Sequence, residues 1–342
     1  MSLQTEARSG KSAGKETYFR PRRLGHANLW VSNLKTSESF YNKVCGFTVE
    51  FWEPDLVATF LGTGHTPHDI GMIEVTGGKA RYGRDGLLQI PEGVGASKGL
   101  GHIAFEVANE KELVEAYFTA KKAGAIANEM SVDHQIAHSI YTFDPDGNCT
   151  EFYCDTVKDW RKVIHGEMSL ITGRWAPGET ELFTDGRWDP NPEVRLVKEA
   201  PVHPRRVTHV VFKTKDMGKM VDYYTGLGGL SVVHEAKDRS IVCLRGSVPA
   251  YRYTIALVQC AGDEKPGYHA TAFELASPAE VDAAEKRCKA GAIAIERSVD
   301  HASKRAFFLL DPDGLRTEFY ARKTADFVDL NKEPAKDRAY LI

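Results

Sequence analysis

The hydrophobic and polar positions of this chain follow two patterns that alternate along it. Apolar and polar side chains alternate over residues 26–31 and again over 70–75, as they do in strands with one buried face. A helical pattern covers residues 37–44 between them. The same order starts again with a strand pattern over residues 102–107 and a helical pattern over 110–122. The patterns therefore predict units of the order β-α-β-β-β.

Turn and cap residues support these elements. The tetrapeptide Asp-Pro-Asp-Gly stands at residues 144–147 and 311–314 between short β-type runs, and it predicts a hairpin turn at both places. Ser277 and Pro278 suit the cap and the first turn of a helix, and Glu280 follows three residues after the serine. We expect a helix to begin there.

The chain contains an internal repeat. The segment AGAIANEMSVDHQIAHSIYTFDPDGNCTEFY begins at Ala123, and AGAIAIERSVDHASKRAFFLLDPDGLRTEFY begins at Ala290, 167 residues later. LGHANLWV around His26 corresponds to VTHVVFKT around His209 at a separation of 183 residues, so the first copy carries extra loop residues. A repeat of this length predicts a duplicated module. We expect an α+β fold in which tandem βαβββ units form two homologous modules.

The repeat also sets the expected limits of the parts, and a length of 342 residues fits two domains. The expected parts are a flexible polar tail over residues 1–20, an N-terminal module over 21–155, a polar connector over 156–204, a C-terminal module over 205–322, and a C-terminal tail or lid over 323–342.

Composition excludes several classes of protein. Hydrophobic residues make up 42% of the chain, which is too many for a disordered protein, and a net charge of −3 argues against nucleic acid as a partner. No apolar run approaches the roughly 20 residues of a membrane span, and no signal peptide is recognisable, so we expect no membrane partner and a cytoplasmic location. The six cysteines form no CxxC pair, which argues against a disulfide framework and a zinc cage.

Two sets of possible metal ligands occupy matching places in the two copies. Each set has two histidines and one glutamate, and the second histidine precedes the glutamate by 49 residues in both copies. The sets are His26, His102 and Glu151, and His209, His269 and Glu318. Two imidazoles and one carboxylate form the facial triad of non-haem Fe(II) oxygenases, and Mn(II) also fits. Zinc remains open on ligand type, although the chain has no HExxH motif. The alternative is that these are ordinary strand residues kept by the duplication.

Three segments of the first copy resemble a known family. LGHANLWV, GLGHIAFEV and YTFDPDGNCTEFY resemble the type I extradiol ring-cleaving dioxygenases, which include catechol 2,3-dioxygenase and belong to the vicinal oxygen chelate (glyoxalase/bleomycin resistance) superfamily. The resemblance covers residues 22–155 and 205–322. It implies Fe(II), or occasionally Mn(II), a catechol-type or hydroquinone-type substrate, O2 as co-substrate, a role in the breakdown of aromatic compounds, and a homo-oligomer.

The resemblance implies further site residues in the first copy, and the second copy lacks several of them. His68, in HDIGM, would exchange protons with the substrate, whereas the second copy has YTIAL over 253–257. Tyr141, ten residues before Glu151, corresponds to a phenylalanine in the second copy. Tyr141 and His134, with His138 as the alternate to His134, would hydrogen-bond the chelated oxygen, and Asn28 would orient the oxygen site. We therefore expect catalysis in the N-terminal module, whereas familiar two-module relatives use the C-terminal one.

Several alternatives remain at this point. The second triad has three interpretations: it binds a second ion, it shares ligands across the modules, or it is a relic. The chain as a whole fits three other functions less well: a glyoxalase-like isomerase or lyase, a binding protein that sequesters an aromatic ligand, and a 4-hydroxyphenylpyruvate-type dioxygenase.

Overall fold

The computed structural model describes residues 16–127, 129–168 and 173–342 of the chain. In the described part of residues 21–155, the N-terminal module has ten strands and two helices. In chain order they are β1 (Arg23–Val31), α1 (Leu34–Lys43), β2 (Thr48–Glu53), β3 (Ala58–Gly62), β4 (Ile70–Glu74), β5 (Arg81–Tyr82), β6 (Leu88–Ile90), β7 (Gly99–Glu106), α2 (Glu110–Lys122), β8 (Met130–Asp133), β9 (Ala137–Phe143) and β10 (Cys149–Asp155). Side-chain oxygens of Asn33 and Asn109 cap the two helices. β5 and β6 belong to the stretch in which the first copy is longer.

The remaining elements belong to the connector, the second module and the C-terminal segment. They are α3 (Trp160–Val163), β11 (Gly166–Glu167), β12 (Gly173–Arg174), β13 (Arg206–Thr214), α4 (Met217–Thr225), β14 (Ser231–Glu235), β15 (Ile241–Arg245), β16 (Ile255–Gln259), β17 (Gly267–Glu274), α5 (Pro278–Ala290), β18 (Arg297–Asp300), β19 (Lys304–Leu310), β20 (Arg316–Arg322), η1 (Ala335–Asp337) and α6 (Arg338–Leu341). α5 begins after Ser277, whose hydroxyl accepts from Glu280 N as the sequence predicts.

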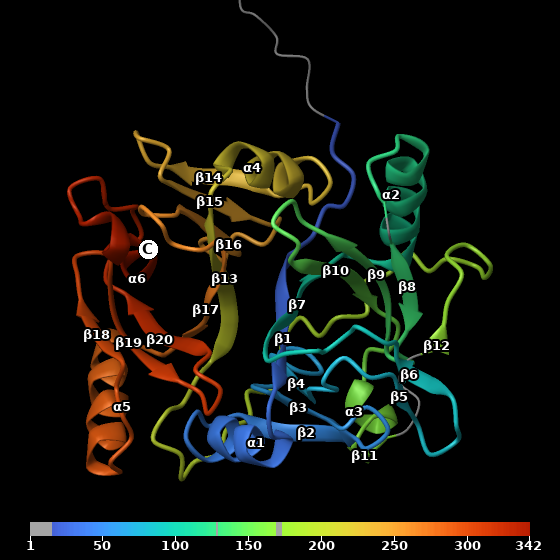
Figure 1. Cartoon of the computed structure of the whole chain (residues 1–342), viewed down its shortest axis with the longest axis horizontal. Helices are drawn as coiled ribbons and strands as arrows, with labels where there is room; N and C mark the ends of the chain where they lie inside the picture. Colours follow the sequence, from blue (N-terminus) through green and yellow to red (C-terminus); the bar gives the residue numbers. More distant parts are fainter. Residues whose placement is uncertain (1–15, 128, 169–172) are drawn as a thin grey trace, which may run out of the picture.

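The strands form two large sheets (Figure 1). The first sheet has the order β11-β2-β3-β4-β1-β7-β10-β9-β8-β12, and the second has the order β14-β15-β16-β13-β17-β20-β19-β18. In the first, β1 is parallel to β4 and antiparallel to β7, and β7 is parallel to β10; β13, β16, β17 and β20 repeat this arrangement. The two modules are therefore equivalent in topology, and the predicted α+β duplication is confirmed.

The connector contributes to the first sheet. β11 pairs with β2 at one edge and β12 pairs with β8 at the other, so this polar stretch extends the sheet at both ends. No helix among the described residues is long and apolar enough to cross a membrane.

The two modules exchange equivalent contacts at their boundary, where α1 and α4 lie at opposite ends (Figure 1). Tyr41 of α1 donates its hydroxyl to Asp311 Oδ2 at 3.2 Å, and Tyr224 of α4 donates to Asp144 Oδ2 at 2.8 Å. Each aspartate also forms its own hairpin turn; Asp144 Oδ1 accepts from Asn148 N at 2.8 Å. The Asp-Pro-Asp-Gly motif therefore makes the predicted hairpin and also anchors a tyrosine of the other module.

Part of the segment predicted as a flexible tail is packed between the modules. Phe19 is completely buried, and its ring stacks on Phe152 with centroids 4.1 Å apart. The amides of Tyr18 and Phe19 donate to the carbonyls of Gly226 and Leu227 in the second module. Burial of an aromatic ring outweighs the entropy lost by ordering these residues. The folded part thus begins before residue 20, and residues 1–15 lie outside the described residues.

Replacing Phe19 by alanine is expected to lower the free energy of unfolding by about 3–5 kcal/mol, because a fully buried aromatic ring leaves a cavity. Denaturant unfolding followed by circular dichroism measures the change. Arg20→Ala is the matched control, since Arg20 is exposed and its loss is expected to change the free energy by less than about 0.5 kcal/mol. A loss below about 1 kcal/mol for Phe19→Ala would mean that this segment does not hold the modules together.

Candidate metal centre

The strand register explains why three residues far apart in sequence meet. Ala104 of β7 lies opposite His26 of β1 on one side and opposite Glu151 of β10 on the other. His102 lies two residues before Ala104 on the same strand and therefore projects from the same face. His26, His102 and Glu151 thus gather on one face of three adjacent strands.

The ligand atoms of these three residues converge. Glu151 Oε2 lies 3.1 Å from His26 Nε2 and 2.9 Å from His102 Nε2. All three atoms lie within 4.8 Å of one another, and within the described parts of the chain no other group of three His, Cys, Asp or Glu side chains meets this condition. His26 and Glu151 are buried and His102 is half-buried. Two nitrogens and one oxygen around one point fit a divalent first-row metal ion.

The electrostatics of the triad also suit a metal. Burial alone raises the pKa of Glu151, but the adjacent imidazoles of His26 and His102 outweigh this and hold its pKa well below the usual range. Burial lowers the pKa of His26, and Glu151 offsets only part of that effect. The glutamate is therefore ionised and His26 is neutral at pH 7, which are the forms that bind metals.

Two residues that the sequence analysis missed support the triad. Ser139 of β9 donates its hydroxyl to Glu151 Oε1 at 2.5 Å and fixes the oxygen that does not face the histidines. Gly71 lies opposite Asn28 in the parallel pair of β1 and β4, and a Cβ at Gly71 would come within 1.6 Å of Asn28 Oδ1. The sequence offers two signals for these residues: Ser139 stands two residues before Tyr141, and Gly71 is the glycine of HDIGM.

The structure places Asn28 and His68 beside the triad. Asn28 Nδ2 lies 3.0 Å from His102 Nε2. The His68 ring centroid lies 4.0 Å from that of His26, and both its nitrogens are buried without a hydrogen-bond partner in the described structure. Burial lowers the pKa of His68 well below its ordinary value, and His26 adds to this. His68 is therefore a neutral imidazole with both nitrogens available.

Tyr141 and His134 form a pair on the other side of the triad. Tyr141 Oη lies 3.0 Å from His134 Nε2, and its ring makes an edge contact with His102 at 5.2 Å between centroids. His138, the alternate to His134, instead lies with its Nδ1 2.6 Å from Glu110 Oε1 and stacks on Trp175. The structure thus favours His134 as the neighbour of Tyr141.

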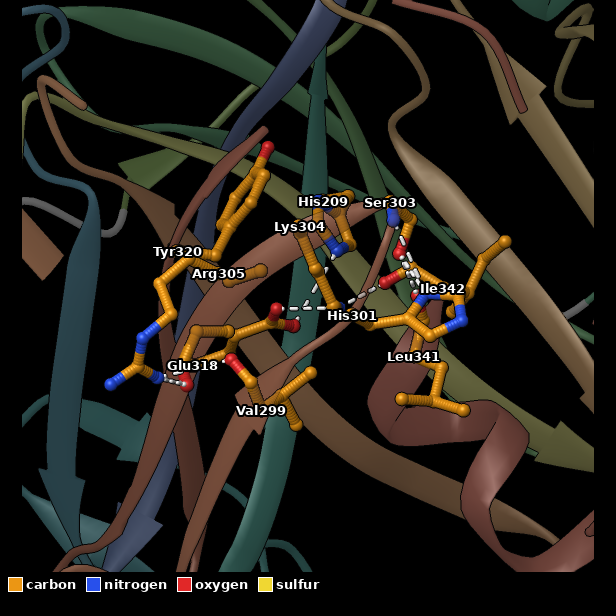
Figure 2. A network of polar contacts seen from close by, with 12 residues as sticks. His209, Val299, His301, Ser303, Lys304, Arg305, Glu318, Tyr320, Leu341 and Ile342 are labelled. Atoms are coloured by element: carbon orange, nitrogen blue, oxygen red, sulfur yellow. Dashed lines mark hydrogen bonds and ion pairs between the residues drawn. The ribbon is translucent and has the colours of Figure 1, made fainter. Parts of the chain in front are cut away.

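In the second triad, His209 and Glu318 have the strand positions of His26 and Glu151, but His269 lies one residue earlier on β17 than His102 does on β7. His209 Nε2 lies 3.8 Å from Glu318 Oε2, and Lys304 Nζ lies 2.6 Å from Glu318 Oε1 (Figure 2). Tyr253 stands where the first module has His68, and its hydroxyl lies 3.4 Å from His209 Nε2. The two triads lie in separate sheets, and among the described residues His26, His102 and Glu151 alone bring three possible ligand atoms together. The second triad as it stands does not fit a metal ion.

The fold and site agree with the comparison to protein families. Residues 23–152 and 206–319 match the model of the Glyoxalase/Bleomycin resistance protein/Dioxygenase superfamily. The chain belongs to this superfamily, and each of its two modules is one matched region. The resemblance seen in the sequence is confirmed at this level.

Two curated proteins are similar in sequence. The chain is 29% identical over 148 residues to biphenyl-2,3-diol 1,2-dioxygenase 3 of Rhodococcus globerulus, which covers 42% of this chain and 71% of that protein. It is 24% identical over 254 residues to catechol-2,3-dioxygenase of Bacillus subtilis (strain 168). That alignment covers 71% of this chain and 76% of the Bacillus protein.

Solved structures share the fold of the whole chain. The 2,3-dioxygenase LapB from Pseudomonas sp. KL28 has a TM-score of 0.62 at 16% identity, covering 92% of this chain and 98% of that one. The Mn(II)-bound glyoxalase from Novosphingobium aromaticivorans has a TM-score of 0.61 at 15% identity, and the match covers 92% of this chain and 86% of the glyoxalase. At these identities the similarity establishes the fold alone, because this fold carries several chemistries.

Proposed function

We propose that this chain is an Fe(II)-dependent extradiol dioxygenase that inserts both atoms of O2 into a catechol-type or hydroquinone-type ring, and that its N-terminal module is the working one. The observation that carries the proposal is the buried triad of His26, His102 and Glu151 beside the unpaired imidazole of His68. The names of the two curated relatives support the reaction, and the Mn(II)-bound neighbour keeps manganese as the alternative metal.

The triad would hold the metal, and the neighbouring residues would handle the protons. Fe(II) held by these three residues would supply Lewis-acid chemistry that lowers the pKa of a diol hydroxyl and would bring the diol and O2 together. His68 then accepts the hydroxyl proton and later returns it, because its neutral ring has a free nitrogen. Tyr141, held by His134, donates to the ring oxygen, and Asn28 orients the oxygen site.

An apolar cluster next to His68 suits an aromatic substrate. The His68 ring makes edge contacts with Phe60 and Phe51, whose centroids lie 4.9 and 6.4 Å away. These phenylalanines belong to a buried cluster that also contains Ile90 and Trp160. Side chains of this kind would bury the apolar faces of an aromatic ring placed beside His68. The cluster comes from β2, β3, the loop around β6 and the connector.

Oxygen consumption tests the proposal. The purified chain is loaded with Fe(II) under anaerobic conditions, and a panel of catechols and hydroquinones is added while O2 uptake is followed on an electrode. We expect uptake in a one-to-one ratio with a yellow ring-opened product, and none from a His26→Ala variant. Absence of uptake across the panel, with iron bound, would refute the dioxygenase and favour the isomerase or the binding protein. A cytoplasmic location and a homo-oligomer stay predictions.

A further inference from the structure

Two residues of the second triad, His209 and Glu318, keep the backbone positions of His26 and Glu151. Ala272 of β17 lies opposite both His209 of β13 and Glu318 of β20, as Ala104 does in the first module. His102 is two residues before Ala104, whereas His269 is three residues before Ala272, at the register shift between Ala270 and Tyr268, so Ala270 holds the position that corresponds to His102. The two sites therefore share the strand positions of the first histidine and the glutamate, and they differ in the position of the second histidine and in the side chains around the triad.

Lys304 provides the main difference. It is the first residue of β19, where the first module has Ala137 as the first residue of β9. Its side chain is 3% exposed, and its Nζ lies 2.6 Å from Glu318 Oε1 and donates to the main-chain oxygen of Ile342 (Figure 2). An amino group thus holds the carboxylate that would bind a metal ion.

Other residues around the second triad add positive charge and close the site. Arg316 Nη1 lies 3.2 Å from His269 Nδ1, whereas the first module has Cys149 at the equivalent place. The ring of Tyr340 packs against His269 at 4.7 Å between centroids, and the side chains of Leu341 and Ile342 join the apolar cluster of the second module. The predicted C-terminal tail or lid is thus packed over this triad.

Two ligand atoms of the second triad nevertheless have no hydrogen-bond partner. Glu318 Oε2 and His269 Nε2 are both buried, and neither forms a hydrogen bond within the described structure. Buried polar atoms are normally paired, because leaving them unpaired is unfavourable. Glu318 Oε2 is the equivalent of the Glu151 oxygen that faces the histidines, and His269 Nε2 is a second buried atom that could bind a metal ion.

We propose that the amino group of Lys304 takes the place of a divalent metal ion at His209, His269 and Glu318, and that this side chain is the main reason why the second module holds no metal ion. A buried carboxylate needs a positive partner, and the lysine supplies it from within the chain. The chain therefore binds one metal ion, at the first triad, and the second triad is a latent metal site. Lys304→Ala, which introduces the residue of the first module, opens that site.

Metal counting with Mn(II) as the probe tests this proposal. The protein is incubated with excess Mn(II) and passed through gel filtration, and the number of Mn(II) ions per chain is then measured by inductively coupled plasma mass spectrometry. We expect one ion in the natural chain, two in Lys304→Ala, and one in Lys304→Arg, which keeps a positive group. In the background of His26→Ala, the Lys304→Ala variant should bind one ion, and adding Glu318→Gln should remove it. Two ions in the natural chain, or no gain in Lys304→Ala, would overturn the proposal.

A reverse exchange keeps the proposal testable if Lys304→Ala does not fold. Ala137→Lys places an amino group next to Glu151, and it should lower the count at the first triad from one to zero, whereas Ala137→Met should leave it at one. Retention of the ion in Ala137→Lys would contradict the proposal. The test is separate from the dioxygenase reaction: a natural chain without any ion would refute the proposed function, while a gain of one ion in Lys304→Ala would still support the latent site.

Discussion

Replacing Glu151 by glutamine is expected to abolish O2 uptake and to reduce metal affinity by more than about a hundredfold. Loss of a group that only supports a metal ligand lowers affinity by about 10–100-fold, and Glu151 is itself the point on which both histidines converge. Glutamine keeps an oxygen but removes the charge, and its amide group would face the histidine nitrogens. Metal content and uptake are measured on the same preparation.

The matched control makes the same change in the second module. Glu318→Gln is combined with Lys304→Met so that no buried charge is left unpaired. This double variant should keep the natural metal content at the first triad and the natural rate of uptake. Uptake at the natural rate in Glu151→Gln, or loss of uptake only in the control, would show that the working site is not in the N-terminal module.

Replacing His68 by phenylalanine is expected to lower kcat by about 10²–10⁴-fold, the range that a general acid or base supplies. Metal content should not change, because His68 is not one of the three converging ligands. The fold should tolerate the exchange, since the ring lies against Phe51 and Phe60 and makes no hydrogen bond in the described structure. Steady-state O2 uptake and metal content are the two measurements.

His65→Phe serves as the control for His68→Phe. His65 lies in the same loop and its Nδ1 contacts the Thr63 hydroxyl at 3.2 Å, so its replacement should alter kcat by no more than a few-fold. An unchanged kcat in His68→Phe would exclude proton transfer by this residue. A loss of metal from His68→Phe would instead assign it a role in the metal site.

The choice between His134 and His138 shows where sequence reasoning stopped short. Both are close to Tyr141 in sequence, and the motif left them as alternates. On β9, His138 lies three residues before Tyr141, so it projects from the opposite face, where it meets Glu110 and Trp175. His134 precedes the strand, and the chain between β8 and β9 brings it back to the Tyr141 hydroxyl. Strand boundaries were needed to make this distinction.

The sequence by itself determined the duplication, the α+β class, the hairpin turns and the three residues of the candidate metal centre. These features depend on the order of residues along single strands and on a repeat, in which the same motif appears at matching places in both copies. Tertiary structure alone decided the burial of Phe19, the use of the connector at both edges of the first sheet, and the support of Glu151 by Ser139. It also decided that Lys304 holds Glu318 in the second triad. The physical reason is that these contacts join side chains from separate strands or modules, and no local pattern records which of them will meet.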